Sequence, residues 1–152
     1  LTALRPGHFQ EKFGDVLGAV LHEGIFLVFA SSADTPLPMV ASRDIAEIAV
    51  QELLADTQTS EAVDIVGPEY TERQVARSLS VVLGKPLEVV PIPEPGWMKA
   101  LVEAGFAPHI AESLADLYRA DEQKRLGPRG DRSIRVTTDI DTTVRHVLAQ
   151  EV

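Results

Sequence analysis

Cysteine is absent from the 152-residue sequence. The chain therefore has no disulfide bond, no thiolate zinc site and no cysteine nucleophile, a composition typical of proteins from a reducing compartment. Long apolar runs are absent as well. None approaches the roughly 20 residues that a helix needs to cross a bilayer, and no secretory leader is recognisable. We therefore expect a cytoplasmic protein without a membrane partner.

Positive charge is scarce. The sequence has 14 lysine and arginine residues against 23 aspartate and glutamate residues, which gives a formal net charge of -9. The one basic stretch, residues 124–135, is interrupted by Gly127, Gly130 and Asp131 and is typical of a solvated loop. Because such a chain repels a polyanion, we expect no nucleic-acid partner.

Several motifs that carry chemistry are also missing. No G-x-S-x-G nucleophile elbow occurs, which argues against a hydrolase. No paired i, i+4 spacing and no acidic companion suited to a metal is found around the four histidines, His8, His22, His109 and His146. We therefore expect no metal site.

The apolar residues that are present suffice for one compact domain, since hydrophobic residues make up 45% of the chain. From Phe9 to Leu21 they repeat at helical spacing, and Gly24 is placed to end that helix. The continuous apolar run over residues 25–30 predicts a buried strand. Residues 31–38 are expected to form a loop.

Two capping boxes mark the starts of further helices. Asp44 with Glu47, and Thr71 with Gln74, have the spacing at which the first side chain accepts from the helix backbone and the second reaches back. The helix that begins at Thr71 is expected to end at Gly84, because glycine readily adopts the left-handed conformation of a helix end.

The remaining elements alternate. Strands are predicted over residues 62–66, 87–92 and 134–136, and helices over residues 97–105, from Pro108 onward and around residues 144–148. This order indicates an α/β layer architecture. The sequence opens on Leu1 inside a strand-like run, so we expect a chain that begins within an element and a first strand with an unpaired edge.

Three stretches together resemble one family. They are LRPGHFQEKF at residues 4–13, RDIA at residues 43–46 and VGPEYT at residues 66–71. This ordered set is similar to the NmrA-like proteins, an atypical branch of the short-chain dehydrogenase/reductase superfamily. Gln10 and Lys12 depart from the family's common Met and Asn at these positions.

In that family a Rossmann domain binds NAD(P), and a smaller carboxyl-terminal subdomain closes over the nicotinamide and the substrate. The resemblance implies the carboxyl-terminal part of a Rossmann-like NmrA-type α/β fold, with short strands and flanking helices and with the amino-terminal dinucleotide-binding half absent. Residues 1–30 would form the last elements of the Rossmann-like sheet. Residues 31–152 would form the smaller α/β lid subdomain on the substrate side.

The glycine pattern of a dinucleotide site, G-x-x-G-x-x-G after a strand, does not occur in this sequence. We therefore expect NAD(P) to be the cofactor of the parent family and this chain alone to bind none. The superfamily's Tyr-x-x-x-Lys pair is missing too, because Gln74 follows Tyr70, and Glu122 follows Tyr118, at that spacing. No catalytic residue is assigned, and hydride chemistry would belong to the cofactor.

By resemblance, the segment after the first strand borders the nicotinamide and substrate cleft. The candidate cofactor-binding residues are Pro6, Gly7, His8 and Phe9, and the candidate substrate-binding residues are Phe13 and Trp97. Plainer interpretations stay open: a strand-to-helix turn at Pro6 and Gly7, an inert surface position for His8, and a core position for Trp97.

Two functions follow from these expectations. The first is the substrate-side portion of an NAD(P)H-dependent oxidoreductase or redox sensor that acts on a small molecule the sequence does not identify. The alternative is a non-enzymatic module that binds a partner, or itself as a homo-oligomer, through the unpaired strand edge and the apolar surface around it.

Overall fold

The order of helices and strands is that of a mixed α/β domain. The computed structural model describes residues 1–56 and 59–151. In chain order the elements are β1 (Thr2–Pro6), β2 (His8–Phe9), η1 (Gln10–Val16), α1 (Leu17–Glu23), β3 (Ile25–Val28), β4 (Leu37–Val40), α2 (Ser42–Leu54), β5 (Glu61–Val66), β6 (Glu69–Tyr70), α3 (Glu72–Leu83), β7 (Glu88–Pro91), η2 (Glu94–Gly96), α4 (Trp97–Glu103), α5 (Pro108–Glu122), β8 (Arg132–Arg135) and α6 (Ile140–Glu151).

Most strand pairs are parallel. One sheet has the order β1-β5-β8 with both pairs parallel, and β3 pairs in parallel with β7. A small sheet has the order β2-β4-β6, in which only β4 and β6 are antiparallel. Within the described strands β1 pairs with β5 alone.

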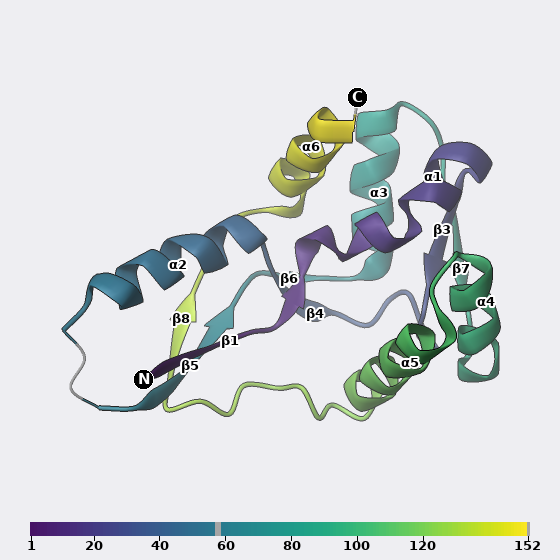
Figure 1. The fold of residues 1–152 in the computed structure, drawn as a ribbon. Helices are drawn as coiled ribbons and strands as arrows, with labels where there is room; N and C mark the ends of the chain where they lie inside the picture. The colour runs from purple at the N-terminus through teal and green to yellow at the C-terminus, as the bar shows by residue number, and fades with distance from the viewer. Residues whose placement is uncertain (57–58, 152) are drawn as a thin grey trace.

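Helices flank the strands (Figure 1). Helix α2 packs beside β1, helices α3 and α6 pack together, and α4 packs on α5. The predicted boundary at residue 30 stays a prediction, although the other two strands in the sheet of β1, strands β5 and β8, come from beyond it.

Two clusters of buried side chains hold these layers together. The larger one joins η1, α1, β3 and the helices α3 to α6, and its fully buried members include Val20, Phe26, Leu79, Trp97 and Leu101. The smaller one lies between α2 and the strands and contains Val40, Ile48 and Ile65. Burial of this apolar surface is the main favourable contribution to folding.

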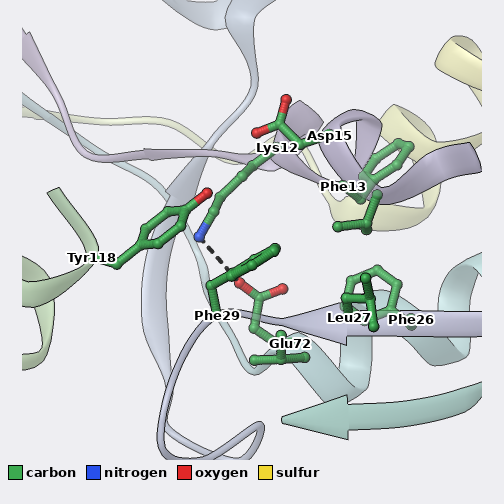
Figure 2. Close-up of a pocket in the computed structure, with 10 residues that line it drawn as sticks. Lys12, Phe13, Asp15, Phe26, Leu27, Phe29, Glu72 and Tyr118 are labelled. Atoms are coloured by element: carbon green, nitrogen blue, oxygen red, sulfur yellow. Dashed lines mark ion pairs between the residues drawn. The ribbon is translucent and has the colours of Figure 1, made fainter. Parts of the chain in front are cut away.

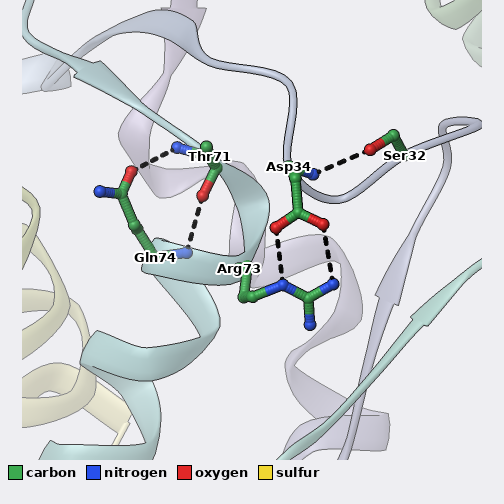
Figure 3. A network of polar contacts seen from close by, with 5 residues as sticks. All are labelled: Ser32, Asp34, Thr71, Arg73 and Gln74. Carbon is green, nitrogen blue, oxygen red and sulfur yellow. Dashed lines mark hydrogen bonds and ion pairs between the residues drawn. The ribbon is translucent and has the colours of Figure 1, made fainter.

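Three local predictions at helix ends are confirmed. Gly24 and Gly84 end their helices in the left-handed conformation, at φ 74° and φ 65°. The capping box is present as well (Figure 3): the Gln74 backbone N–H donates to Thr71 Oγ1 at 3.1 Å, and the Thr71 N–H donates to Gln74 Oε1 at 2.8 Å. These interactions need only residues close in sequence, which is why spacing alone predicts them.

The capping box predicted for Asp44 and Glu47 is wrong. Helix α2 begins at Ser42, and its N-cap residue Ala41 makes no side-chain cap. A carboxylate from another element takes that place, since Glu11 Oε1 accepts from the Ser42 N–H at 2.9 Å and from Ser42 Oγ at 2.7 Å. Asp44 instead accepts from Thr138 Oγ1 at 2.7 Å. The start of α2 is therefore capped by Glu11, a residue distant in sequence, and not by Asp44.

Two further predictions need correction. Residues 31–38 are not all loop, because β4 begins at Leu37 and pairs with β2 and β6. The helix predicted from Phe9 starts later and in a tighter form, as the 3₁₀ helix η1, and becomes an α-helix only at Leu17. Its apolar spacing is helical throughout, but β2 holds Phe9 in an extended conformation against β4.

Gly67 lies against the backbone of β4 and has no room for a side chain. A Cβ at this position would come within 1.8 Å of the Met39 carbonyl oxygen. The neighbouring backbone is held there, because the Met39 N–H donates to the Pro68 carbonyl at 2.9 Å.

We expect Gly67→Ala to lower the free energy of unfolding by about 3 kcal/mol, because the added methyl group forces β4 away from this segment. Gly14→Ala is the matched control, since nothing lies within 4 Å of its Cβ position. Urea unfolding followed by circular dichroism measures both. Equal midpoints for the two variants would contradict the close approach.

Candidate functional site

The predicted cofactor segment crosses from one sheet to another. Pro6 ends β1 opposite Ile65, whereas His8 and Phe9 form β2 and pair with β4. Gly7 lies between the two strands, and a Cβ there would stand 3.3 Å from the Pro38 carbonyl oxygen. The segment is therefore a strand-to-strand crossing and not a direct strand-to-helix turn.

His8 has a specific partner. Its Nε2 lies 2.9 Å from Asp121 Oδ1, and the two side chains are 17% and 22% exposed. The pair ties β2 to the carboxyl-terminal end of α5. His8 is therefore engaged in a contact between elements and is not an isolated surface histidine.

Two adjoining pockets open beside η1. The first, called here the aromatic pocket, has about 290 Å³ of space, its open side included, and its walls include Lys12, Phe13, Asp15, Phe26, Phe29, Glu72 and Tyr118. The second, called the His8 pocket, has about 220 Å³ on the same basis, and its walls include His8, Phe9, Gln10, Met39 and Val75. Lys12, Phe13 and Glu72 line both.

Lys12 lines both pockets, and Figure 2 shows its side chain reaching toward Tyr118 and Glu72. Its side chain extends from η1 and places the ammonium Nζ 4.6 Å from the centroid of the Tyr118 ring and 3.7 Å from Glu72 Oε1. A cation over an aromatic face within about 6 Å is attracted by the ring quadrupole. The ammonium is thus held by an aromatic ring on one side and a carboxylate on the other.

Glu72 is positioned by the start of α3. It is the first residue of that helix, directly after the capping box at Thr71. The next residue, Arg73, donates from Nε to Asp34 Oδ1 at 2.7 Å and from Nη2 to Asp34 Oδ2 at 3.0 Å (Figure 3). These bonds hold the loop before β4 on the first turn of α3. They also lower the pKa of the Asp34 carboxyl.

Tyr118 forms one wall of the aromatic pocket and is itself packed from behind. Its ring stacks on Phe29 with centroids 5.4 Å apart and meets Trp97 edge to face at 5.8 Å. Trp97 is fully buried, donates from Nε1 to the Ile92 carbonyl at 2.7 Å, and lines neither pocket. Its position is a core position, and it supports the wall that Tyr118 provides.

Carboxylates outnumber cations around this wall. Burial raises the pKa of Tyr118 to about 12, and the negative charges of Asp15 and Glu72 act in the same direction. Partial burial also raises the pKa of Asp15, while the Lys12 ammonium opposes that shift. At neutral pH the aromatic pocket therefore presents a neutral phenol, two acidic side chains and one ammonium.

Gln10 is the buried polar residue that holds η1 in place. Its Nε2 donates to the Thr138 carbonyl at 2.7 Å and to the Met39 carbonyl at 3.3 Å, and its Oε1 accepts from Thr143 Oγ1 at 2.5 Å. With its amide so engaged, Gln10 has a structural role. The departure of Gln10 and Lys12 from the family pattern was the one signal in the sequence that could have directed attention to both residues.

Neither Glu72 nor Tyr118 was singled out as a site residue by the sequence, because each comes from a helix far along the chain from η1.

Over the described ranges, no group of three or more potential metal ligands occurs. In the same ranges, no helix is long and apolar enough to span a bilayer. The site therefore combines an aromatic wall, the ammonium of Lys12 and two acidic side chains, Asp15 and Glu72.

No protein-family model matches the chain. The chain is similar to an NAD(P)H azoreductase of Xenophilus azovorans, with 26% identity over 118 residues that cover 77% of this chain and 41% of that protein. It is also similar to agroclavine dehydrogenase of Claviceps purpurea (strain 20.1), with 30% identity over 132 residues that cover 82% of this chain and 45% of that protein. The chain thus spans less than half the length of these curated relatives.

Solved structures show the fold. The triphenylmethane reductase of Citrobacter sp. superposes with a TM-score of 0.78 at 23% identity, covering 97% of this chain and 53% of that one. The NADPH-dependent quinone oxidoreductase of Escherichia coli gives 0.72 at 21% identity, again over 97% of this chain and 53% of that one. The chain therefore has the mixed α/β arrangement of Rossmann-like NAD(P)-binding reductases, over about half their length.

The raised pKa of Tyr118 predicts a loss of stability at high pH. Its folded-state value is about 12 against an ordinary 10.0. Between these values the unfolded chain has released a proton that the folded chain keeps, so the free energy of unfolding falls as pH rises. We expect Tyr118 to account for about 2 kcal/mol of this loss.

Urea unfolding at about pH 9 and about pH 11.5, in the wild type and in Tyr118→Phe, measures this contribution. The variant has no hydroxyl to ionise at this position and should lose less stability over the same interval. An equal loss in both proteins would show that the Tyr118 hydroxyl is not the responsible group.

Proposed function

We propose that the chain is the substrate-side portion of an NmrA-like NAD(P)H-dependent oxidoreductase. The observation that carries the proposal is that His8, Phe9 and Phe13, which the family resemblance assigns to the cleft, line the two adjoining pockets beside η1. Support also comes from the relatives, which are named as an NAD(P)H azoreductase, a dehydrogenase and NADPH-linked reductases.

The residues of the crossing suit the nicotinamide end of the cofactor. Phe9 is 48% exposed and offers an apolar face at the His8 pocket, beside the polar His8 and Asp121 pair. Pro6 and Gly7 would form the backbone border of that end. The glycine-rich turn that a pyrophosphate needs has no counterpart in the sequence, so the proposal assigns no phosphate contact to this chain.

In this proposal the cofactor supplies the hydride, and the chain binds and orients the acceptor. Phe13 lies at the junction of the two pockets, where a small-molecule acceptor bound in the aromatic pocket would approach the nicotinamide end at Phe9. The aromatic walls would exclude water from the reacting atoms. No side chain is assigned as the proton donor.

The alternative, a non-enzymatic module that self-associates through the unpaired edge of β1, has less support. Its structural basis is the free edge and the exposed apolar end of α2, where Leu53 and Leu54 are 84% and 82% exposed. The named relatives are oxidoreductases, which favours the enzymatic function.

Hydride transfer tests the proposal directly. We expect the natural protein that contains this chain to oxidise NADPH or NADH when a quinone or an azo dye is supplied, as measured by loss of the reduced nicotinamide absorbance. Phe9→Ala should lower kcat/KM about tenfold, which corresponds to about 1.4 kcal/mol of lost transition-state binding. Leu53→Ala, an exposed residue that lines neither pocket, should leave kcat/KM unchanged.

A protein that oxidises neither nucleotide with any of these acceptors would refute the reductase assignment. If Phe9→Ala and Leu53→Ala behaved alike in an active protein, the reductase assignment would stand and the placement of the cleft at β2 would be wrong.

The chain by itself should bind neither nucleotide. Calorimetric titration of the folded 152-residue chain with NADPH and NADH is expected to show no saturable heat up to millimolar ligand, because the phosphate-binding turn is missing. Saturable binding would overturn this expectation and would locate a cofactor site within the chain, with the segment from Pro6 to Phe13 the first place to look.

A further inference from the structure

We propose that the aromatic pocket is a binding site for a planar organic cation, and that the Lys12 ammonium occupies the cation position when no ligand is bound. The proposal rests on the proposed function only in naming this ligand as the substrate class. The binding itself is a property of this chain's own side chains and can be tested without a nicotinamide.

One side of the pocket is an aromatic wall. The Tyr118 ring already carries a cation 4.6 Å from its centroid, so its face is accessible to positive charge. Phe29 stacks on the same ring at 5.4 Å and an interplanar angle of 20°, and Phe26 and Phe29 line the pocket with it, so the wall is largely aromatic. Aromatic rings that converge on a cation are the usual recognition site for quaternary and delocalised organic cations.

The acidic side chains of the pocket also favour a cation. Glu72 Oε1 lies 3.7 Å from the Lys12 ammonium, and the Glu72 side chain is only 16% exposed. Asp15 lines the same pocket. If the ammonium left, the pocket would keep two acidic side chains and no cation of its own. An incoming organic cation would restore the balance, whereas a sulfonated or phosphorylated ligand would face repulsion from both carboxylates.

The Lys12 side chain can leave the pocket without disturbing the fold. Its side chain is 32% exposed and ends in a flexible four-carbon stem. The residues that anchor η1 are its neighbours Gln10 and Phe13, which are 1% and 3% exposed. Rotation of the lysine side chain therefore requires no movement of the helix.

Departure of Lys12 would also make room. Lys12 and Glu72 stand in the walls of both pockets, so the ion pair partitions what would otherwise be one cleft from Phe26 to Phe9. A ligand that displaced the ammonium could therefore reach from the aromatic wall at Tyr118 toward Phe9.

The test uses dyes of opposite charge. The folded chain is titrated with methylene blue, a planar organic cation, and with pyrene-1-sulfonate, a planar anionic dye, by calorimetry in the absence of nicotinamide. We expect saturable binding of the cation and none of the anion. Lys12→Met, which removes the competing ammonium and keeps the apolar stem, should tighten cation binding about tenfold, and Glu72→Gln should weaken it about tenfold.

Matched controls separate this site from general effects of charge. Lys99→Met removes an equally charged lysine whose side chain is 79% exposed on α4, and it should leave cation affinity unchanged. Tyr118→Phe keeps the ring and should keep the affinity, whereas Tyr118→Leu should lose about tenfold. Circular dichroism and melting temperature confirm that each variant is folded.

Several results would overturn the proposal. Unchanged or weaker cation binding in Lys12→Met would make the lysine a structural latch between η1, α3 and α5. Equal binding of the anionic dye, or equal effects of Lys12→Met and Lys99→Met, would indicate non-specific adsorption.

The two proposals fail separately. A chain that binds the cation, within a natural protein that transfers no hydride, would keep the cation site and refute the reductase. A natural protein that reduces quinones, with a chain that binds no organic cation, would keep the reductase and refute the cation site.

Discussion

The hydrogen bonds of the buried Gln10 amide are the constraint on which the site depends. They join η1 to the Met39 carbonyl in β4, to the Thr138 carbonyl before α6, and to Thr143 within α6. An amide without these partners would leave unsatisfied polar groups in a closed interior, which is costly. The short helix that follows β2 is therefore held in one orientation against two distant segments.

That orientation decides which side chains meet. From η1, Phe13 points into the larger core, while Lys12 reaches Tyr118 of α5 and Glu72 of α3. On β2, His8 contacts Asp121 at the far end of α5. Four elements thus converge on one place, and α5 is attached there at two points. The stacked and edge-on aromatic contacts of Tyr118 hold that helix against Phe29, which follows β3, and against Trp97 of α4.

The same arrangement explains how the proposed functions relate to the fold. Strand pairing places the crossing at Pro6 to Phe9 beside the pockets, and the helices supply the walls that would select the acceptor. A reductase of this kind leaves hydride chemistry to its cofactor, so the protein's own residues act through shape and charge. The main chemical feature of the aromatic pocket is that two acidic side chains, Asp15 and Glu72, and a single ammonium lie beside its aromatic wall.

The sequence by itself determined the features that depend on neighbouring residues. Gly24, Gly84 and the capping box at Thr71 were predictable because each requires only a local backbone conformation or a partner three residues away. The alternation of apolar runs with helical spacing likewise determined the α/β class. His8 and Phe9 were predicted to contact the cofactor and Phe13 the substrate; all three line a pocket, and those roles stay predictions.

Only the tertiary structure decided which distant residues share a site. Spacing assigned a cap to Asp44, but Glu11 from η1 provides the carboxylate at the start of α2. Trp97 was a candidate for binding the substrate, but it is buried behind Tyr118, whose ring lines the pocket. Packing and long-range hydrogen bonds bring together side chains that are far apart in the sequence. No spacing pattern in the sequence marks such pairs, so only the folded structure shows that they are in contact.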